Sequence, residues 1–138
     1  MSTSPYPTAT SGSDERESRP LMDRLLVFSL VEEIQSLRNE PQWEENEVNS
    51  RTLAKADDFR TVISVMHTGA ALDERQGDAR TSIHVVEGSA ELTVDEGTRA
   101  LSTGDLAVVD AGFPWTLRAM RDCAVLLTIA WPAEKTGV

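Results

Sequence analysis

The sequence predicts an all-β domain, a sandwich or a barrel, preceded by one α-helix. Short segments rich in β-branched and apolar residues recur from residue 51 onward, and turn signals separate them. Only one stretch of the chain has the apolar period of a helix. Many short strands at close spacing are typical of sandwiches and barrels, whereas regular alternation with helices would indicate a parallel sheet.

Six strands are predicted from β-branched and apolar runs. They cover residues 59–66, 81–86, 90–94, 106–109, 115–120 and 124–130. The tripeptide Asp95-Glu96-Gly97 lies between two alternating segments and is a good hairpin signal. We therefore expect the third strand to turn back directly on the chain that follows it.

One helix is predicted over residues 20–40. Pro20 suits a helix start, and Pro41 is expected to end the helix. Apolar residues recur between them at spacings of three and four: Leu26, Val27, Leu30, Val31, Ile34 and Leu37. Two interpretations of this stripe stay open, because it could pack on the body of the domain or cross to a second subunit. We expect a homodimer.

The length of 138 residues suits one compact domain. Residues 1–19 are rich in Ser, Thr and Pro and lack an apolar period, which predicts a disordered tail. The β-domain is expected over residues 51–132, and residues 133–138 are expected to form a second, short tail.

The charge of the chain argues against several partners. Its formal net charge is −10, and its 13 Lys and Arg residues are scattered among 23 Asp and Glu residues. Phosphates would be repelled, so no nucleic-acid partner is expected. No apolar run approaches the roughly 20 residues that cross a bilayer, and no secretory signal is recognised at the amino terminus. We expect a cytoplasmic protein without a membrane partner.

The single cysteine, Cys123, excludes an internal disulfide. It begins the apolar run 123–127, so we expect a buried and unreactive thiol.

Two glycine-anchored blocks carry the most specific signal. The first runs from Gly69 to Gly88, and the second contains Gly104, Asp110, Gly112, Trp115 and Ala119. Their layout resembles the two motifs of the cupin superfamily, with the spacing kept through both blocks. The resemblance covers residues 51–132. It implies a cupin-type double-stranded β-helix, which is a jelly-roll barrel, with one N-terminal α-helix.

The same resemblance identifies the positions that hold a divalent metal in metal-dependent cupins, where three His and one Glu converge. This chain carries Arg75, Gly77, Thr81 and Trp115 there. A guanidinium is always protonated, glycine has no side chain, threonine is a poor neutral ligand and indole offers only an N–H donor. We therefore expect no metal, no cofactor and no metal-dependent catalysis.

A metal site built from His67, His84 and a carboxylate is the alternative to that ligand set, but no tight ligand spacing supports it. His84 lies three residues after Thr81, so on a strand it faces the opposite side, and His67 lies at a strand end before Gly69. The sequence also lacks the Gly-x-Ser-x-Gly elbow and the Gly-rich phosphate loop. No catalytic residue is assigned.

Three functions follow as hypotheses. The first is a binding or regulatory module in which a small anionic or aromatic molecule contacts Arg75, Thr81 and Trp115, with its carboxylate on Arg75 and its apolar part on Trp115. Its alternative is that Trp115 fills the cavity while Arg75 pairs with an acid such as Asp73 or Asp78. The second is a dimerising scaffold that engages a protein partner through the helix. The third is a metal-independent enzyme of unknown reaction.

Overall fold

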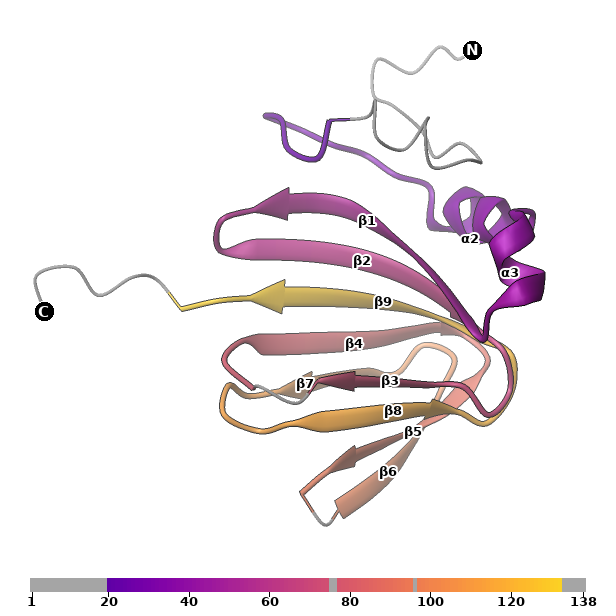
Figure 1. Ribbon diagram of the computed structural model, residues 1–138. Coiled ribbons are helices and arrows are strands. Elements are labelled where there is room, and N and C mark those ends of the chain that lie inside the picture. Colours follow the sequence, from indigo (N-terminus) through magenta and orange to yellow (C-terminus); the bar gives the residue numbers. More distant parts are fainter. Residues whose placement is uncertain (1–19, 75–76, 96, 133–138) are drawn as a thin grey trace, which may run out of the picture.

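Two antiparallel sheets face each other in a computed structural model that describes residues 20–74, 77–95 and 97–132 (Figure 1). The first sheet, in spatial order, consists of β1 (Val48–Ala56), β2 (Phe59–Met66), β9 (Cys123–Ala130), β4 (Arg80–Glu87) and β7 (Leu106–Val109). The second consists of β3 (Ala71–Glu74), β8 (Trp115–Ala119), β5 (Ser89–Val94) and β6 (Gly97–Ser102). The chain crosses repeatedly between the sheets, as in a jelly roll. The predicted jelly-roll fold is confirmed.

All six predicted strands are present, with ends that shift by no more than one residue. The hairpin predicted at Asp95 is also present, because β5 pairs with β6 and Val94 lies opposite Gly97. Three further strands, β1, β3 and β6, were not predicted. The barrel therefore begins at Val48, slightly before the predicted boundary at residue 51.

The core lies between the inner faces of the two sheets. In β4 every second residue is buried, so Thr81, Ile83 and Val85 face inward while His84 lies on the outer face. The largest members of this core are Met66, Ile83, Val85, Leu92, Val109, Trp115, Leu117, Val125 and Leu127. Burial of this apolar surface is the main force that holds the sheets together.

The glycine at the end of the first glycine block, Gly88, is required by the packing around it. Its φ is +95°, and a Cβ atom there would lie 2.5 Å from the carbonyl oxygen of Asp122. Only glycine fits such a corner without displacing backbone. The absence of a side chain at Gly88 lets the turn between β4 and β5 lie in close contact with the start of β9.

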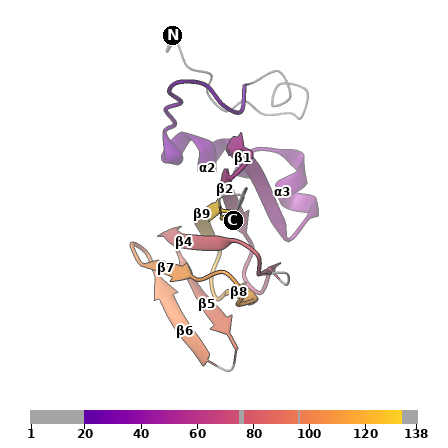
Figure 2. The same ribbon diagram turned by 90° about the vertical axis from the view of Figure 1, so that its left-hand side faces the viewer.

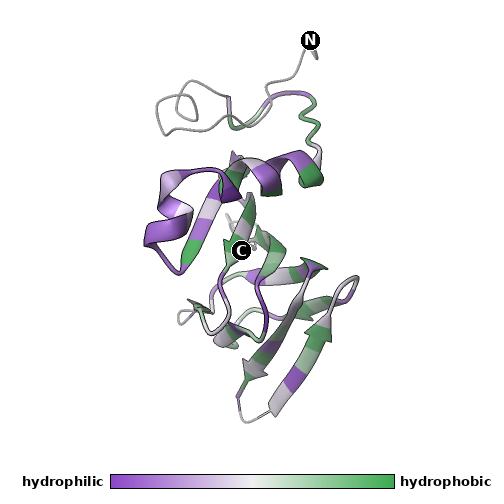
Figure 3. Ribbon diagram, turned by 90° about the vertical axis from the view of Figure 1, so that its right-hand side faces the viewer, coloured by the Kyte–Doolittle hydropathy of each residue, from purple (hydrophilic) through white to green (hydrophobic). Residues whose placement is uncertain are grey.

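Two short helices cover the outer face of the first sheet, at the end where β1 and β2 lie (Figures 1 and 2). Helix α2 spans Leu30–Arg38, and helix α3 spans Pro41–Glu45. Figure 3 shows that hydrophilic residues predominate in the helices, whereas hydrophobic and hydrophilic residues both occur along the strands. The apolar contacts of the helices are concentrated in Ile34 and Leu37, which are buried against the sheet.

The prediction of a helix over residues 20–40 was wrong at both ends. The helix starts only after Ser29, whose hydroxyl accepts the N–H of Glu32 at 3.3 Å and caps the first turn. The preceding segment runs beside β1 instead, where the carbonyl of Leu21 accepts the N–H of Lys55 at 2.8 Å. Pro41 does not end α2 but occupies the first turn of α3.

The predicted apolar stripe is divided by this arrangement. Ile34 and Leu37 pack on the body of the domain, as the first interpretation expected. Val27 and Val31 are 54% and 63% exposed and contribute little to that contact. No helix in the described part of the chain has the length and apolarity needed to cross a membrane.

A buried ion network fixes the helices on the sheet. Arg51 of β1 is 2% exposed and donates to Glu33 of α2 at 3.0 Å and to Glu40 at 2.6 Å. The side-chain amide of Asn49 donates to the same Glu40 at 3.1 Å and to the carbonyl of Leu37 at 2.9 Å. Buried charges are tolerated only when such partners are present, because desolvation of an unpaired ion is costly.

We predict that Arg51→Met destabilises the domain by about 3–5 kcal/mol, because it leaves two carboxylates buried without their cation. Urea unfolding followed by circular dichroism measures this change. The matched control is Arg38→Met, which removes the partly exposed pair of Arg38 with Glu87 and should cost about 0–1 kcal/mol. Equal losses in the two variants would contradict the assigned role of the buried network.

Cys123 belongs to the barrel core, as expected from its apolar run. It is fully buried, and its Sγ atom lies 3.9 Å from the Sδ atom of Met66. Burial raises the pKa of the Cys123 thiol to about 11, so the thiol is neutral near physiological pH. A neutral, buried thiol is a poor nucleophile.

We predict that native protein resists a thiol reagent such as iodoacetamide at mildly alkaline pH, whereas urea-unfolded protein is alkylated completely. Mass spectrometry of the quenched reaction counts the alkyl groups. Rapid stoichiometric labelling of the folded chain would show that Cys123 is accessible and would contradict this placement.

Candidate functional site

The predicted pocket residues that the structure describes lie inside the barrel. Thr81 on β4 is 2% exposed, and Trp115 at the start of β8 is 7% exposed. Trp115 is part of the hydrophobic core, as the core-filling alternative expects. Arg75 lies outside the described residues, so its predicted contacts stay predictions.

The loops that carry the former metal positions meet through their backbones. The N–H of Gly112, from the second glycine block, donates to the carbonyl of Gly77, from the first. Gly77 is buried at φ +69°, and a Cβ atom there would lie 3.1 Å from the backbone nitrogen of Phe113. A side chain at this position would press on the backbone of the neighbouring loop and would need a left-handed φ, so the position suits glycine.

The described residues at the family's metal positions do not fit a divalent cation. Gly77 offers no side chain, Thr81 offers a neutral hydroxyl, and the indole of Trp115 offers no lone pair suited to a metal. Across residues 20–74, 77–95 and 97–132, His, Cys, Asp and Glu side chains form no group of three or more that could hold a metal.

The two histidines lie on outer surfaces and serve other contacts. The ring of His67 stacks on Trp43 of α3 with centroids 3.5 Å apart, and its Nε2 atom lies 2.7 Å from the carbonyl oxygen of Trp43. His84 faces outward from β4, between Leu106 of β7 and Leu126 of β9 in the sheet register. His67 therefore helps to fix α3 on the sheet.

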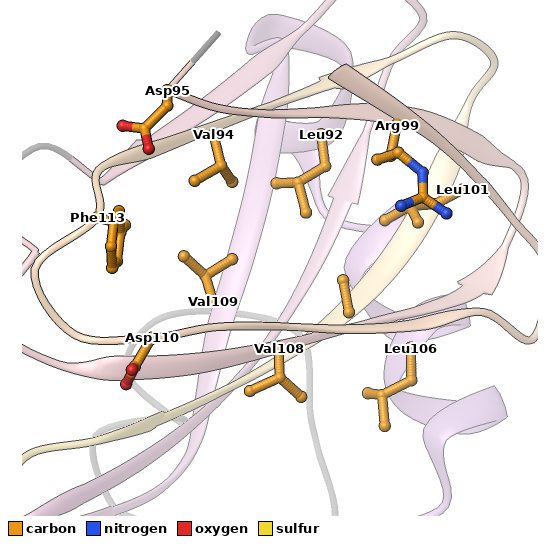
Figure 4. A pocket seen from close by; sticks show the side chains of 11 residues that line it. Leu92, Val94, Asp95, Arg99, Leu101, Leu106, Val108, Val109, Asp110 and Phe113 are labelled. Atoms are coloured by element: carbon orange, nitrogen blue, oxygen red, sulfur yellow. The ribbon is translucent and has the colours of Figure 1, made fainter. Parts of the chain in front are cut away.

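A groove that sequence reasoning missed lies where the two sheets open (Figure 4). Strand β7 ends the first sheet and β6 ends the second, and the groove runs between them with a volume of about 530 Å³. Leu92 and Val109, each 6% exposed, belong to its lining and to the core. The remaining apolar lining comes from Val94, Leu101, Leu106, Ala107, Val108 and Phe113.

Charged residues lie at opposite ends of this groove. Figure 4 shows Arg99 beside Leu101 at one end, and Asp95 and Asp110 flanking Phe113 at the other. Asp110 accepts two hydrogen bonds from the guanidinium of Arg80, at 2.6 and 2.9 Å, and one from the N–H of Ala111. These bonds and the positive charge of Arg80 hold the pKa of Asp110 below its usual value.

A smaller hollow of about 230 Å³ shares Asp95 with the groove. Trp115 lines this hollow, together with Glu74, Thr93, Pro114 and Thr116. The predicted pocket residue Trp115 thus borders the small hollow, and the larger groove is lined by residues that carry no family motif apart from Asp110.

Solved structures of small bacterial proteins share this fold. A conserved protein of unknown function from Streptococcus pyogenes superposes with a TM-score of 0.66 at 23% identity, over 83% of this chain and 94% of the other. A cupin superfamily protein from Desulfitobacterium hafniense gives a TM-score of 0.60 at 21% identity, over 63% and 80%. KdgF from a Halomonas species gives 0.57 at 20% identity, over 62% and 82%. These identities show the fold alone.

The sequence comparisons assign the chain to a family. No curated protein matches it in sequence. The sequence pattern of the family described as the EutQ-like cupin domain matches residues 54–136, which is more than half of the chain and includes both glycine blocks. The chain belongs to the cupin superfamily, as a EutQ-like cupin domain.

Proposed function

We propose that this cupin is a metal-independent binding module for a small molecule with an apolar or aromatic body, which it holds in the groove between β6 and β7. The observation that carries the proposal is the groove itself. Its volume of about 530 Å³ lies within the range of roughly 300–1,000 Å³ that small-molecule sites occupy. Most of its lining is apolar, with a few charged groups at the ends.

The exposure of Phe113 supports the same proposal. This side chain lies at one end of the groove and is 44% exposed, although large apolar side chains are usually covered. A ligand seated between the sheet edges would remove part of this surface from water, at roughly 25 cal/mol for each Å² of apolar area. Trp115 stays a candidate contact at the smaller hollow, where a ligand that extends past Asp95 would meet it.

The proposal needs no metal because the former metal positions do not supply ligands. Of the described positions, Gly77 has no side chain, and Thr81 and Trp115 are buried and offer no donor suited to a divalent ion. A ligand in the groove is held instead by apolar contact, which makes its binding independent of divalent ions.

We predict that the uncharged aromatic probe indole binds in the groove and that Ala107→Phe abolishes this binding. Ala107 lines the groove from the inner face of β7, and a phenyl ring there would occupy the ligand's volume. An NMR titration of isotope-labelled protein, with and without a chelator, should shift the amide signals of β5, β6 and β7 equally in both conditions.

The matched control is Ala100→Phe on β6. Ala100 is exposed and does not line the groove, so indole should bind this variant as it binds the unmodified chain. Binding that survives Ala107→Phe, or that disappears when a chelator is added, would contradict the proposed function.

A second proposal concerns self-association through the N-terminal segment and α2. Met22, Leu25, Val27 and Val31 are each more than half exposed, and a hollow of about 290 Å³ beside them is lined by Leu26, Phe28 and Leu53 among others. Apolar residues gathered in this way are typical of surfaces between subunits. We propose that a second copy of the chain covers them in a homodimer.

We predict that Val31→Glu shifts the protein from dimer to monomer in size-exclusion chromatography with light scattering, because a carboxylate would be buried at the interface. Val108→Glu, at an equally exposed apolar residue on β7, should leave the dimer intact. A monomeric unmodified chain, or dissociation by Val108→Glu alone, would contradict this placement of the interface.

A further inference from the structure

The register of the β5–β6 hairpin places a cation on the inner side of the groove. Arg99 of β6 lies directly opposite Leu92 of β5, and Leu101 lies opposite Ala90. Residues that face each other across two strands share one face of the sheet. Because Leu92 and Ala90 are buried in the core, Arg99 and Leu101 project on the core side of their strand. Figure 4 shows the guanidinium of Arg99 beside Leu101 at that end of the groove.

This guanidinium has no carboxylate partner within the described residues. Arg38, Arg51 and Arg80 each form a salt bridge there, whereas Arg99 forms no ion pair and no hydrogen bond to any described group. No described residue uses its five N–H donors. In a chain with 23 acids and 13 bases, a cation beside an apolar surface that no described carboxylate pairs provides charge complementarity for an anion.

At the other end of the groove, Asp95 is the carboxylate that would repel an anion. Asp95 and Asp110 flank Phe113 there, and the charge of Asp110 is already matched by Arg80. Asp95 lies in the hairpin turn with a φ of +55° and is exposed. A ligand with negative charge at both ends would therefore place one of them against a carboxylate, and a ligand with a single anionic end has one favoured orientation.

We propose that the ligand is an amphipathic monocarboxylate whose carboxylate binds Arg99 and whose apolar or aromatic body lies on Leu92, Val109 and Phe113. This inference rests on the proposed function and adds the chemical class and direction of the ligand. Arg99 is the residue that determines specificity, because a planar guanidinium can hold a carboxylate through two parallel hydrogen bonds. The end of the ligand near Asp95 is neutral or cationic.

The test compares three probes of matched shape: phenylacetate, phenylacetamide and phenethylamine. Dissociation constants are measured by NMR titration at low ionic strength. We expect phenylacetate to bind about tenfold more tightly than phenylacetamide, because a charge-assisted hydrogen bond replaces a neutral one. Phenethylamine should bind more weakly than the amide, and the preference for the carboxylate should shrink in high salt.

Arg99→Gln should bring the affinity for phenylacetate down to that for phenylacetamide and leave the amide's affinity unchanged. The matched control is Arg121→Gln, which removes the same charge from an exposed residue outside the groove and should keep the preference. At the other end, Asp95→Asn should tighten the binding of phenylenediacetate, which carries two carboxylates. Asparagine tolerates the positive φ of this turn, so the hairpin is preserved.

Equal binding of phenylacetate and phenylacetamide by the unmodified chain would overturn the inference, as would a preference that survives Arg99→Gln. If both probes still shift the amides of β5, β6 and β7, that result leaves the proposed function standing. If no aromatic probe binds in the groove, the inference and the proposed function fail together.

Discussion

The packing of the inner faces of the two sheets determines where this fold is closed and where it is open. Buried side chains from both sheets form one core cluster, which includes Trp115 and Leu117 from one sheet and Ile83 and Val85 from the other. The contact ends at the last strand of each sheet. Among the described strands, β6 and β7 have no outer neighbour, and β6 is almost entirely exposed. The groove lies at this open edge of the two sheets.

Edge strands expose unpaired backbone N–H and C=O groups, which can pair with another chain and cause aggregation. Two features limit that hazard in this fold. β7 has only four residues, and β6 carries the inward-facing Arg99. A charge on the inner side of an edge strand discourages pairing with another chain. The same guanidinium can therefore protect the free edge and recognise an anion, and these two roles do not compete because a small ligand leaves the strand edges unpaired.

Much of the fold could be predicted, because six strands are rich in β-branched and apolar residues. The three strands that were missed lack that signal for different reasons. β1 buries the polar residues Asn49 and Arg51 in the network under α2. These residues interrupt the alternation of apolar and polar residues that predicts a strand. β3 is four residues long, and β6 is a polar edge strand. The helix was extended too far because Leu26 and Val27 continue its apolar spacing, although their segment is held beside β1.

Less of the candidate site than of the fold could be predicted from the sequence. Family spacing predicted that Thr81 and Trp115 lie inside the barrel, and both side chains are buried there. The groove arises from the register of β5 with β6 and from the distance between two sheet edges, neither of which a single sequence reports. The one available signal was the pairing implied by the hairpin at Asp95, which places Arg99 and Leu92 on a common face.

The anomalous bromine signal in crystals of the protein grown with bromophenylacetate locates the ligand in the fold. We expect a bromine peak between β6 and β7, near Phe113, with the carboxylate of the ligand at Arg99. A peak beside Thr81, in the interior of the barrel, would show instead that the ligand binds at the family's metal positions and that the groove is not the binding site.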